Sequence, residues 1–218
     1  MHRVASLAVE KSLFEANKRI AHDNHQHLME HGVRSFDFMG SIGSGKTLII
    51  EKLMDMLKKE GKKVGAVAGD VSGNDDYLRF LKHSDIVANV NTGKDCHLDA
   101  HRIGHALDDL PLGNIDYLFI ENVGNLVCPS DFPLGTDKRI VVISTTEGDD
   151  MIRKHPVIFG LADLIIINKV DLAPMVDVDI NILTTDAKRI APGKPVHLTD
   201  AKHGTGLDEL LSALRDEK

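Results

Sequence analysis

Cysteine is scarce in this 218-residue chain, tryptophan is absent, and aromatic residues make up only 4% of the sequence. Two cysteines cannot frame a disulfide-stapled domain, so we expect a protein of the reducing cytoplasm. No apolar run approaches the roughly 18 residues that a membrane helix needs, and the first residues lack the apolar stretch of a signal peptide. We therefore expect no membrane partner.

Positive charge is also in the minority, with 26 Lys and Arg against 33 Asp and Glu and a formal net charge of −7. Nucleic-acid binding depends on clustered cations that neutralise phosphates, so this balance argues against a nucleic-acid partner. The residue present in excess is histidine, with twelve copies, which leaves metal chemistry open.

Short apolar runs alternate with amphipathic segments beyond residue 32. Runs such as Val141-Val142-Ile143 and Leu164-Ile165-Ile166-Ile167 suit strands that are buried on both faces of a parallel sheet. The pattern predicts strands at Val33–Met39, Val64–Asp70, Ile86–Asn91, Ile115–Glu121, Arg139–Thr145, Leu164–Asn168 and Pro195–Thr199, and helices at 45–60, 98–110, 149–160, 177–190 and 206–216. This alternation predicts a right-handed, doubly wound α/β domain with a mostly parallel sheet over residues 33–218.

Residues 1–32 are expected to form an N-terminal helical extension. The helix is predicted over residues 4–31, where an apolar stripe recurs at spacings of four, three and four, formed by Val9, Leu13, Ala16 and Ile20. Gly32 is the expected stop. Four histidines also fall in this segment at helical spacing, namely His22, His25, His27 and His31. We interpret them as a solvated polar face rather than as a metal site.

A phosphate-binding loop follows the first predicted strand. The pattern G-x-x-x-x-G-K-[ST] is matched by Gly40-Ser41-Ile42-Gly43-Ser44-Gly45-Lys46-Thr47. The backbone N–H groups of Gly43, Ser44 and Gly45 are expected to face a β-phosphate at a helix N-terminus. Lys46 would reach the β- and γ-phosphates, and the Thr47 hydroxyl would bind Mg²⁺. The alternative is an ordinary Gly-rich turn, but the strand before the loop and the helix after it favour the phosphate site.

Guanine is the base that the later sequence predicts. Asn168-Lys169-Val170-Asp171 ends an apolar strand, and the Asp171 carboxylate can accept from both N1–H and the 2-amino group of guanine, a pair that adenine lacks. Lys169 can lie along the base, and Asn168 can tie the segment back to the phosphate loop. The backbone of Ala201 and Lys202 then occupies the place of a loop that contacts the guanine O6 atom. Alone, such a quartet is often a solvated turn.

Acidic residues near the strand ends are candidates for Mg²⁺ and water contacts. Glu121 ends a strand and stands where GTPases have the D-x-x-G segment, with the Gly124 N–H placed to contact a γ-phosphate. Asn125 stands where Ras-like enzymes carry a water-orienting Gln, so slow intrinsic hydrolysis is expected. Asp70 and Asp76 lie in an acidic loop after another strand, and their alternative role is in ordinary Asx turns and helix caps.

The two cysteines fall near strand ends that should meet at one edge of the sheet. Cys96-His97 precedes a predicted helix, and Cys128 lies just beyond the Glu121 segment. Thiolates and imidazoles suit Zn²⁺, Ni²⁺ or copper, and a second subunit could complete a half-site. His97, His101 and His105 are spaced four apart, which predicts one helix face and a further candidate site at His101 and His105. The alternative is a pair of buried, inert thiols.

These motifs resemble the HypB family, the nickel-insertion GTPases of [NiFe]-hydrogenase maturation. The resemblance covers nearly the whole chain, and its most specific strings are N-T-G-K-D-C-H-L-D-A at 91–100 and F-I-E-N-V-G-N-L-V-C-P at 119–129. It implies a SIMIBI-class P-loop fold and a GTPase that hydrolyses GTP, dimerises with GTP and delivers nickel. The implied partners are a HypA-type nickel chaperone and the hydrogenase large-subunit precursor.

Residue by residue, the resemblance implies that Cys96, His97 and Cys128 form a metal site shared by two protomers, with Asp76 and Glu121 near Mg²⁺. Many relatives carry an N-terminal C-x-x-C-G-C motif or a histidine-rich stretch, and this chain has no cysteine before residue 96. One alternative is a urease-type, UreG-like GTPase, whose C-P-H motif is absent here. Another is a non-enzymatic zinc or nickel binder with a vestigial nucleotide site, against which the intact Lys46 and Asp171 argue.

Overall fold

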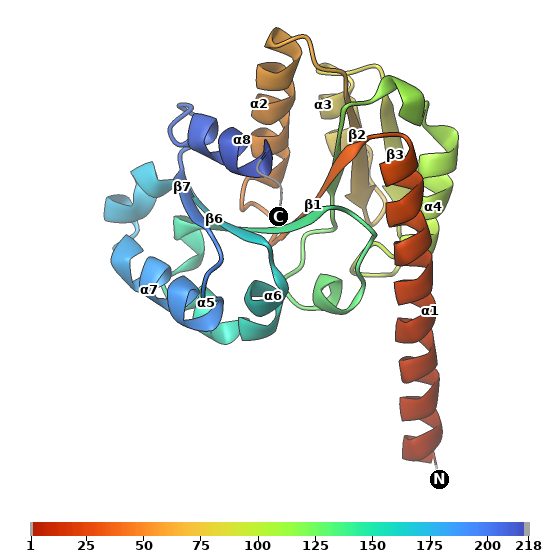
Figure 1. Ribbon diagram of the computed structural model, residues 1–218. Coiled ribbons are helices and arrows are strands. Elements are labelled where there is room, and N and C mark those ends of the chain that lie inside the picture. The colour runs from red at the N-terminus through yellow and green to blue at the C-terminus, as the bar shows by residue number, and fades with distance from the viewer. Residues whose placement is uncertain (1, 216–218) are drawn as a thin grey trace.

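The computed structural model describes residues 2–215, and in this part of the chain seven parallel strands form one sheet in the order β3-β2-β4-β1-β5-β6-β7 (Figure 1). The strands are β1 Arg34–Gly40, β2 Val64–Asp70, β3 Val87–Asn91, β4 Tyr117–Glu121, β5 Lys138–Ser144, β6 Leu164–Asn168 and β7 Val196–Thr199. The chain order reverses at β1, between β4 and β5. Ligands bind outside the carboxyl ends of the strands at such a switch point. The predicted doubly wound α/β fold is confirmed, and the sheet is parallel throughout.

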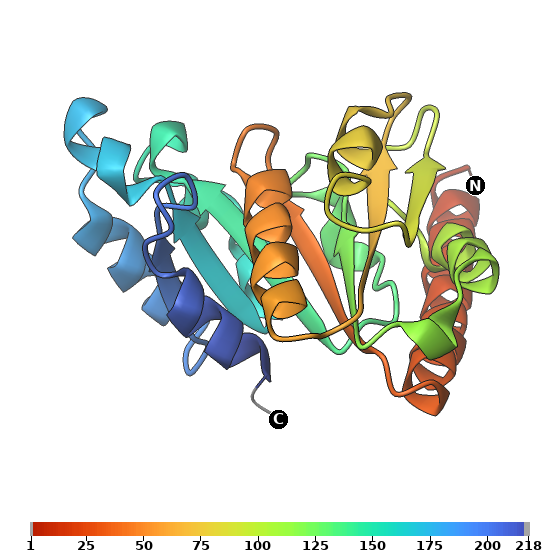
Figure 2. The same ribbon diagram turned by 90° about the horizontal axis from the view of Figure 1, so that it is seen from above.

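Helices cover both faces of this sheet (Figures 1 and 2). They are α1 His2–Glu30, α2 Lys46–Lys59, α3 Asp75–Phe80, α4 Ala100–Asp109, α5 Met151–Lys154, α6 Pro156–Leu161, α7 Ile180–Ile190 and α8 Leu207–Arg215. On one face α2 and α8 pack on a core that includes Phe36 and Phe38 of β1. On the other face α4 covers the β2–β4 side of the sheet, and α5, α6 and α7 cover the β5–β6 side. Within residues 2–215, no helix has the length and apolar character needed to span a bilayer.

Two predicted segments differ in the structure. The helix predicted over 149–160 is split into α5 and α6, because Pro156 has no N–H to donate and His155 adopts a non-helical backbone. The acidic loop predicted after β2 contains the short helix α3, which begins at Asp75. Asp76 therefore lies in the first turn of a helix, where a carboxylate is favoured by the helix dipole. The remaining helices begin close to their predicted residues, and Asp99 and Asp179 cap α4 and α7.

The apolar stripe predicted for α1 is wrong. Leu13 is 58% exposed, and the buried face is formed instead by Asn17, Ala21, Asn24 and Leu28 at the same four-three-four spacing; the Val9 side chain lies outside the described residues. Asn17 accepts a hydrogen bond from the Ala100 N–H and donates to the Pro133 carbonyl, while Asn24 donates to the carbonyls of Ala100 and Leu134.

Directional polar contacts therefore dock α1 beside α4, and the N-terminal end of the helix extends beyond the rest of the molecule (Figure 1).

Candidate functional site

The phosphate loop joins β1 to α2 at the carboxyl edge of the sheet, and two glycines make its path feasible. Gly40 has a φ of +150°, and a Cβ there would overlap the carbonyl oxygen of Val142 on β5. Gly45 has a φ of +100° and caps α2, and a Cβ there would overlap the Asn168 amide. Ser44 between them is fully buried. The loop can therefore curl tightly over the strand ends only with glycine at these positions.

The side chains of Lys46 and Thr47, at the start of α2, contact Glu121 at the end of β4. The Thr47 hydroxyl donates to Glu121 Oε1 at 2.9 Å, and Lys46 Nζ lies 3.9 Å from the same oxygen. Lys46 also donates to the carbonyls of Gly40 and Ser41 at 3.1 Å each. Burial raises the pKa of Glu121 to about 7 and lowers the pKa of Lys46, and each charge partly offsets that effect on the other.

The donor set fits a magnesium ion. Glu121 Oε2 is buried and has no hydrogen-bond partner among the described residues, and the Thr47 hydroxyl lies beside the same carboxylate. Mg²⁺ prefers oxygen ligands and is held in nucleotide sites by one or two carboxylates together with phosphates. Glu121 and Thr47 are therefore the groups that could hold it here.

A cavity of about 430 Å³ opens over these residues. Its walls include Gly43, Gly45, Lys46, Thr47, Asp70, Asp76, Arg79, Glu121, Gly124 and Lys169. Asp70, at the end of β2, accepts a hydrogen bond from the Val71 N–H at 2.6 Å. Asp76 lies 3.8 Å from the Arg79 guanidinium, whose other ion pair is with Glu51. The sequence did not single out Arg79, because α3 was not predicted.

The predicted base-reading segment is tied to the phosphate loop by Asn168. Its Nδ2 donates to the Ser44 carbonyl at 3.0 Å, which confirms the predicted contact. Its Oδ1 accepts from the Thr199 hydroxyl at 3.0 Å and from the Ala201 N–H at 3.2 Å. A single buried amide therefore joins the phosphate loop, the end of β6 and the loop after β7.

The groups that would face a base are more exposed than Asn168. Lys169 donates from Nζ to the Gly43 carbonyl at 2.6 Å, and its φ of +59° turns the chain so that Asp171 follows on the surface. Asp200, in the loop expected to contact the base, and His203, for which the sequence indicated no role, hydrogen-bond to each other at 2.5 Å. Their ligand atoms lie within 4.8 Å of the Asp171 carboxylate. Ala201 is buried and Lys202 is exposed.

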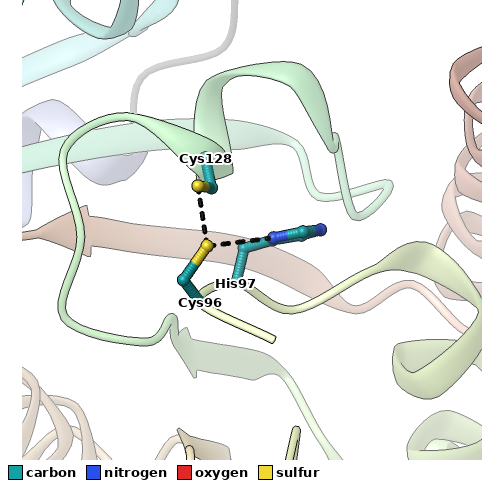
Figure 3. A group of neighbouring side chains, drawn as sticks. All are labelled: Cys96, His97 and Cys128. Carbon is teal, nitrogen blue, oxygen red and sulfur yellow. Dashed lines mark hydrogen bonds between the residues drawn. The ribbon is translucent and has the colours of Figure 1, made fainter. Parts of the chain in front are cut away.

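The thiol–imidazole residues come together at the same edge (Figure 3). Cys96 Sγ lies 2.7 Å from Cys128 Sγ and 3.9 Å from His97 Nδ1, and one ligand atom from each of the three residues lies within 4.8 Å of the others. The His97 ring stacks on Phe132 at 3.9 Å between centroids.

The protonation of this cluster suits a soft divalent metal ion. Partial burial lowers the pKa of His97, so its imidazole is neutral at pH 7 and has a lone pair to donate. The hydrogen bond with Cys96 raises the pKa of the Cys128 thiol, and burial and the repulsion between two neighbouring thiolates raise it further. A divalent cation would remove that repulsion, and the exposed Cys96 leaves the cluster open to solvent.

His97 does not share a helix face with His101 and His105, because α4 begins only at Ala100. The rings of His101 and His105 are 4.6 Å apart on the exposed side of α4. Among the side chains that the structure describes, neither these two nor His22, His25, His27 and His31 join a group of three candidate ligands.

One short segment connects the nucleotide cavity to the thiol cluster. Gly124 packs so closely on Ile42 of the phosphate loop that a Cβ would overlap the Ile42 side chain. The Asn125 N–H donates to the Gly40 carbonyl at 3.0 Å, and Asn125 Oδ1 accepts from the Val127 N–H at 2.7 Å. Cys128 follows directly. The phosphate loop and the thiol are therefore joined by three consecutive contacts.

Comparison with known proteins identifies close relatives. Residues 36–198 match the family model CobW/HypB/UreG, nucleotide-binding domain. The chain is 58% identical over 211 residues, covering 97% of this chain and 95% of the other, to a probable hydrogenase maturation factor HypB from Methanocaldococcus jannaschii.

Two solved structures are similar to nearly the whole chain, each with a TM-score of 0.86. One is hydrogenase maturation factor HypB from Archaeoglobus fulgidus, at 46% identity and covering 92% of this chain and 98% of that one. The other is HypB from Helicobacter pylori in complex with nickel, at 35% identity and covering 91% of this chain and 93% of that one.

Proposed function

Because the chain belongs to the CobW/HypB/UreG nucleotide-binding family, and within it to the HypB maturation factors, we propose that it is a GTP-hydrolysing metallochaperone that delivers nickel during [NiFe]-hydrogenase maturation. The observation that carries the proposal is the short segment from Glu121 to Cys128. Its first residue contacts Lys46 and Thr47 of the phosphate loop, and its last residue contacts Cys96. Nucleotide state and metal cargo thus share one stretch of eight residues.

The nucleotide chemistry follows from the cavity. Lys46 would exchange its two loop carbonyls for phosphate oxygens, and Glu121 with Thr47 would hold Mg²⁺, which neutralises developing charge on the phosphates. Asn125 offers only a short amide where faster GTPases orient water with Gln. Its amide oxygen is already engaged by the Val127 N–H, so turnover should be slow.

Turnover of GTP and ATP at equal concentration tests the nucleotide assignment. The expected result is slow GTP hydrolysis and a marked preference over ATP. Lys46→Ala should abolish tight nucleotide binding, because the lysine is the positive charge at the phosphates. Equal turnover of both nucleotides would refute the guanine assignment, and unchanged GTP affinity in Lys46→Ala would show that the loop is not the phosphate site. Absence of any turnover would leave a metal-binding protein without enzymatic activity.

The metal cargo would be held by Cys96, His97 and Cys128. Three ligands from one chain leave at least one coordination position of a tetrahedral ion open, and the exposed position of Cys96 allows a second copy to approach. A GTP-bound homodimer that brings two such half-sites together would close the site, and hydrolysis would reopen it for release. Transfer from a HypA-type nickel chaperone to the hydrogenase large-subunit precursor is the corresponding role.

Metal titration in two nucleotide states tests the coupling. Linkage requires that metal and nucleotide change each other's affinity equally, and typical couplings are about 5- to 150-fold. We expect Ni²⁺ or Zn²⁺ affinity to differ in that range between the complexes with a non-hydrolysable GTP analogue and with GDP. Cys128→Ala should remove the difference and leave GTP binding intact. Identical metal affinity and stoichiometry in both states would refute the coupling.

A further inference from the structure

A carboxylate lies in the middle of the central strand, where an apolar residue is the norm. Asp37 of β1 is completely buried, and its alternating position directs it to the sheet face opposite Phe36 and Phe38. On that face β1 separates the apolar cluster under α4 from the one under α5, α6 and α7. Burial of an unpaired carboxylate is costly, so its partners should indicate why it is present.

The first partner is Asn122, which follows Glu121 at the end of β4. Its Oδ1 accepts from two backbone N–H groups, those of Leu98 at 3.1 Å and Val123 at 3.0 Å. Because that atom accepts twice, the other atom of the amide is Nδ2, which donates to Asp37 Oδ1 at 3.1 Å. The orientation of Asn122 therefore depends on an acceptor at position 37. Leu98 directly follows Cys96-His97.

The second partner is Arg139, directly opposite Asp37 on β5. Its guanidinium donates to the Pro129 carbonyl at 2.6 Å and to the Ser130 carbonyl at 3.3 Å, the two residues that follow Cys128. Asp37 Oδ2 lies 4.0 Å from Arg139 Nε, and both atoms are buried without a hydrogen-bond partner in the described chain. The negative charge thus compensates a cation whose other nitrogens hold the Cys128 turn.

We propose that Asp37 is a positioning residue that sets the Cys96-His97 loop and the Cys128 turn at the separation one metal ion requires. It acts through Asn122 on the first and through Arg139 on the second. This role rests on the proposed metal site. Asp37 does not itself line the cavity above the phosphate loop, whereas Asn122 does, and Asn at position 37 would still offer that amide an acceptor. Groups that orient metal ligands without touching the metal contribute about 10- to 100-fold to affinity.

Asp37→Asn tests the assignment, because the amide keeps the size of the side chain but removes the charge and offers a single acceptor. Zn²⁺ and Ni²⁺ would be titrated separately against a chromophoric chelator, and a fluorescent GDP would report nucleotide affinity. We expect metal affinity to fall by about 10- to 100-fold and nucleotide affinity to stay unchanged. Ser35→Ala is the matched control, since Ser35 is buried on the same face of β1 and its hydroxyl bonds only to Asp137.

If Asp37→Asn does not fold, Arg139→Lys decides the question. It keeps a cation opposite Asp37 but cannot span both carbonyls, so metal affinity should fall while nucleotide binding remains. Unchanged metal affinity in a folded Asp37→Asn, or an equal loss in Ser35→Ala, overturns the positioning role. The two failures are distinguished by Cys128→Ala. If this variant binds metal as tightly as the wild type, both the positioning role and the proposed metal site are overturned.

Discussion

The buried Asp37 should leave a measurable mark on the pH dependence of stability. Burial raises its pKa from 3.8 to about 6, while Arg139 and Asn122 oppose the shift. In the unfolded chain the carboxyl group loses its proton near pH 4, but in the folded protein it keeps the proton to about pH 6. The folded state therefore binds more protons between these values, and stability falls as pH rises through that window.

The size of the effect follows from the shift. About two pKa units at 1.36 kcal/mol each correspond to about 3 kcal/mol over the whole window, of which about 1 kcal/mol falls between pH 5 and pH 7. Urea unfolding of the wild type and of Asp37→Asn at several pH values isolates this contribution, because other titrations cancel in the difference. The wild type should lose stability relative to the variant as pH rises. If the difference in stability between the wild type and Asp37→Asn stays constant from pH 5 to pH 7, the raised pKa of Asp37 is contradicted.

Three further substitutions test the nucleotide edge. Gly45→Ala should abolish nucleotide binding and lower the melting temperature, because φ is positive and a Cβ overlaps the Asn168 amide, a strain of about 1–3 kcal/mol; unchanged binding would contradict the loop geometry. Asn168→Ala should lower the free energy of unfolding by about 3 kcal/mol, since it strips the buried Ser44 carbonyl and Ala201 N–H of their partner, and chemical denaturation showing a loss below about 1 kcal/mol would contradict this tie. Asp171→Asn should leave stability within about 0.5 kcal/mol, because the side chain is exposed, and should shift preference from GTP to XTP in competition binding; retained GTP preference would refute its role in base reading.

The strands were predictable because each of them can be recognised from a short stretch of sequence. Runs such as Leu164-Ile165-Ile166-Ile167 are apolar on both faces, and only a parallel sheet covered by helices buries both. The phosphate loop was predictable for the same reason, since its glycines, lysine and threonine are contiguous. Helix α1 was predicted, but its buried face was not, because that face uses Asn17 and Asn24, which no hydrophobic pattern detects.

The candidate site was only partly predictable, because much of it is built between strands. Asp37, Asn122 and Arg139 are separated by 85 and 102 residues in sequence, and they meet only because β1 lies between β4 and β5. Nothing in the sequence links these three residues to one another. Cys96 and Cys128 could be placed at one edge by the rule for parallel strands, whereas the stacking of His97 on Phe132 could not.

The docking of α1 connects a long helix to the segments that carry the thiol cluster. The helix has 29 residues and is about 43 Å long, and Asn17 holds it near its midpoint to Ala100 N and Pro133 O. Those two backbone groups belong to the segments that follow Cys96-His97 and Cys128. A shift of α1 by one residue, along or around its axis, would leave the buried asparagines unpaired. These hydrogen bonds therefore fix the position of the helix. The hydrogen bonds of Asn17 therefore tie one helix to the chain on both sides of the thiol cluster at once.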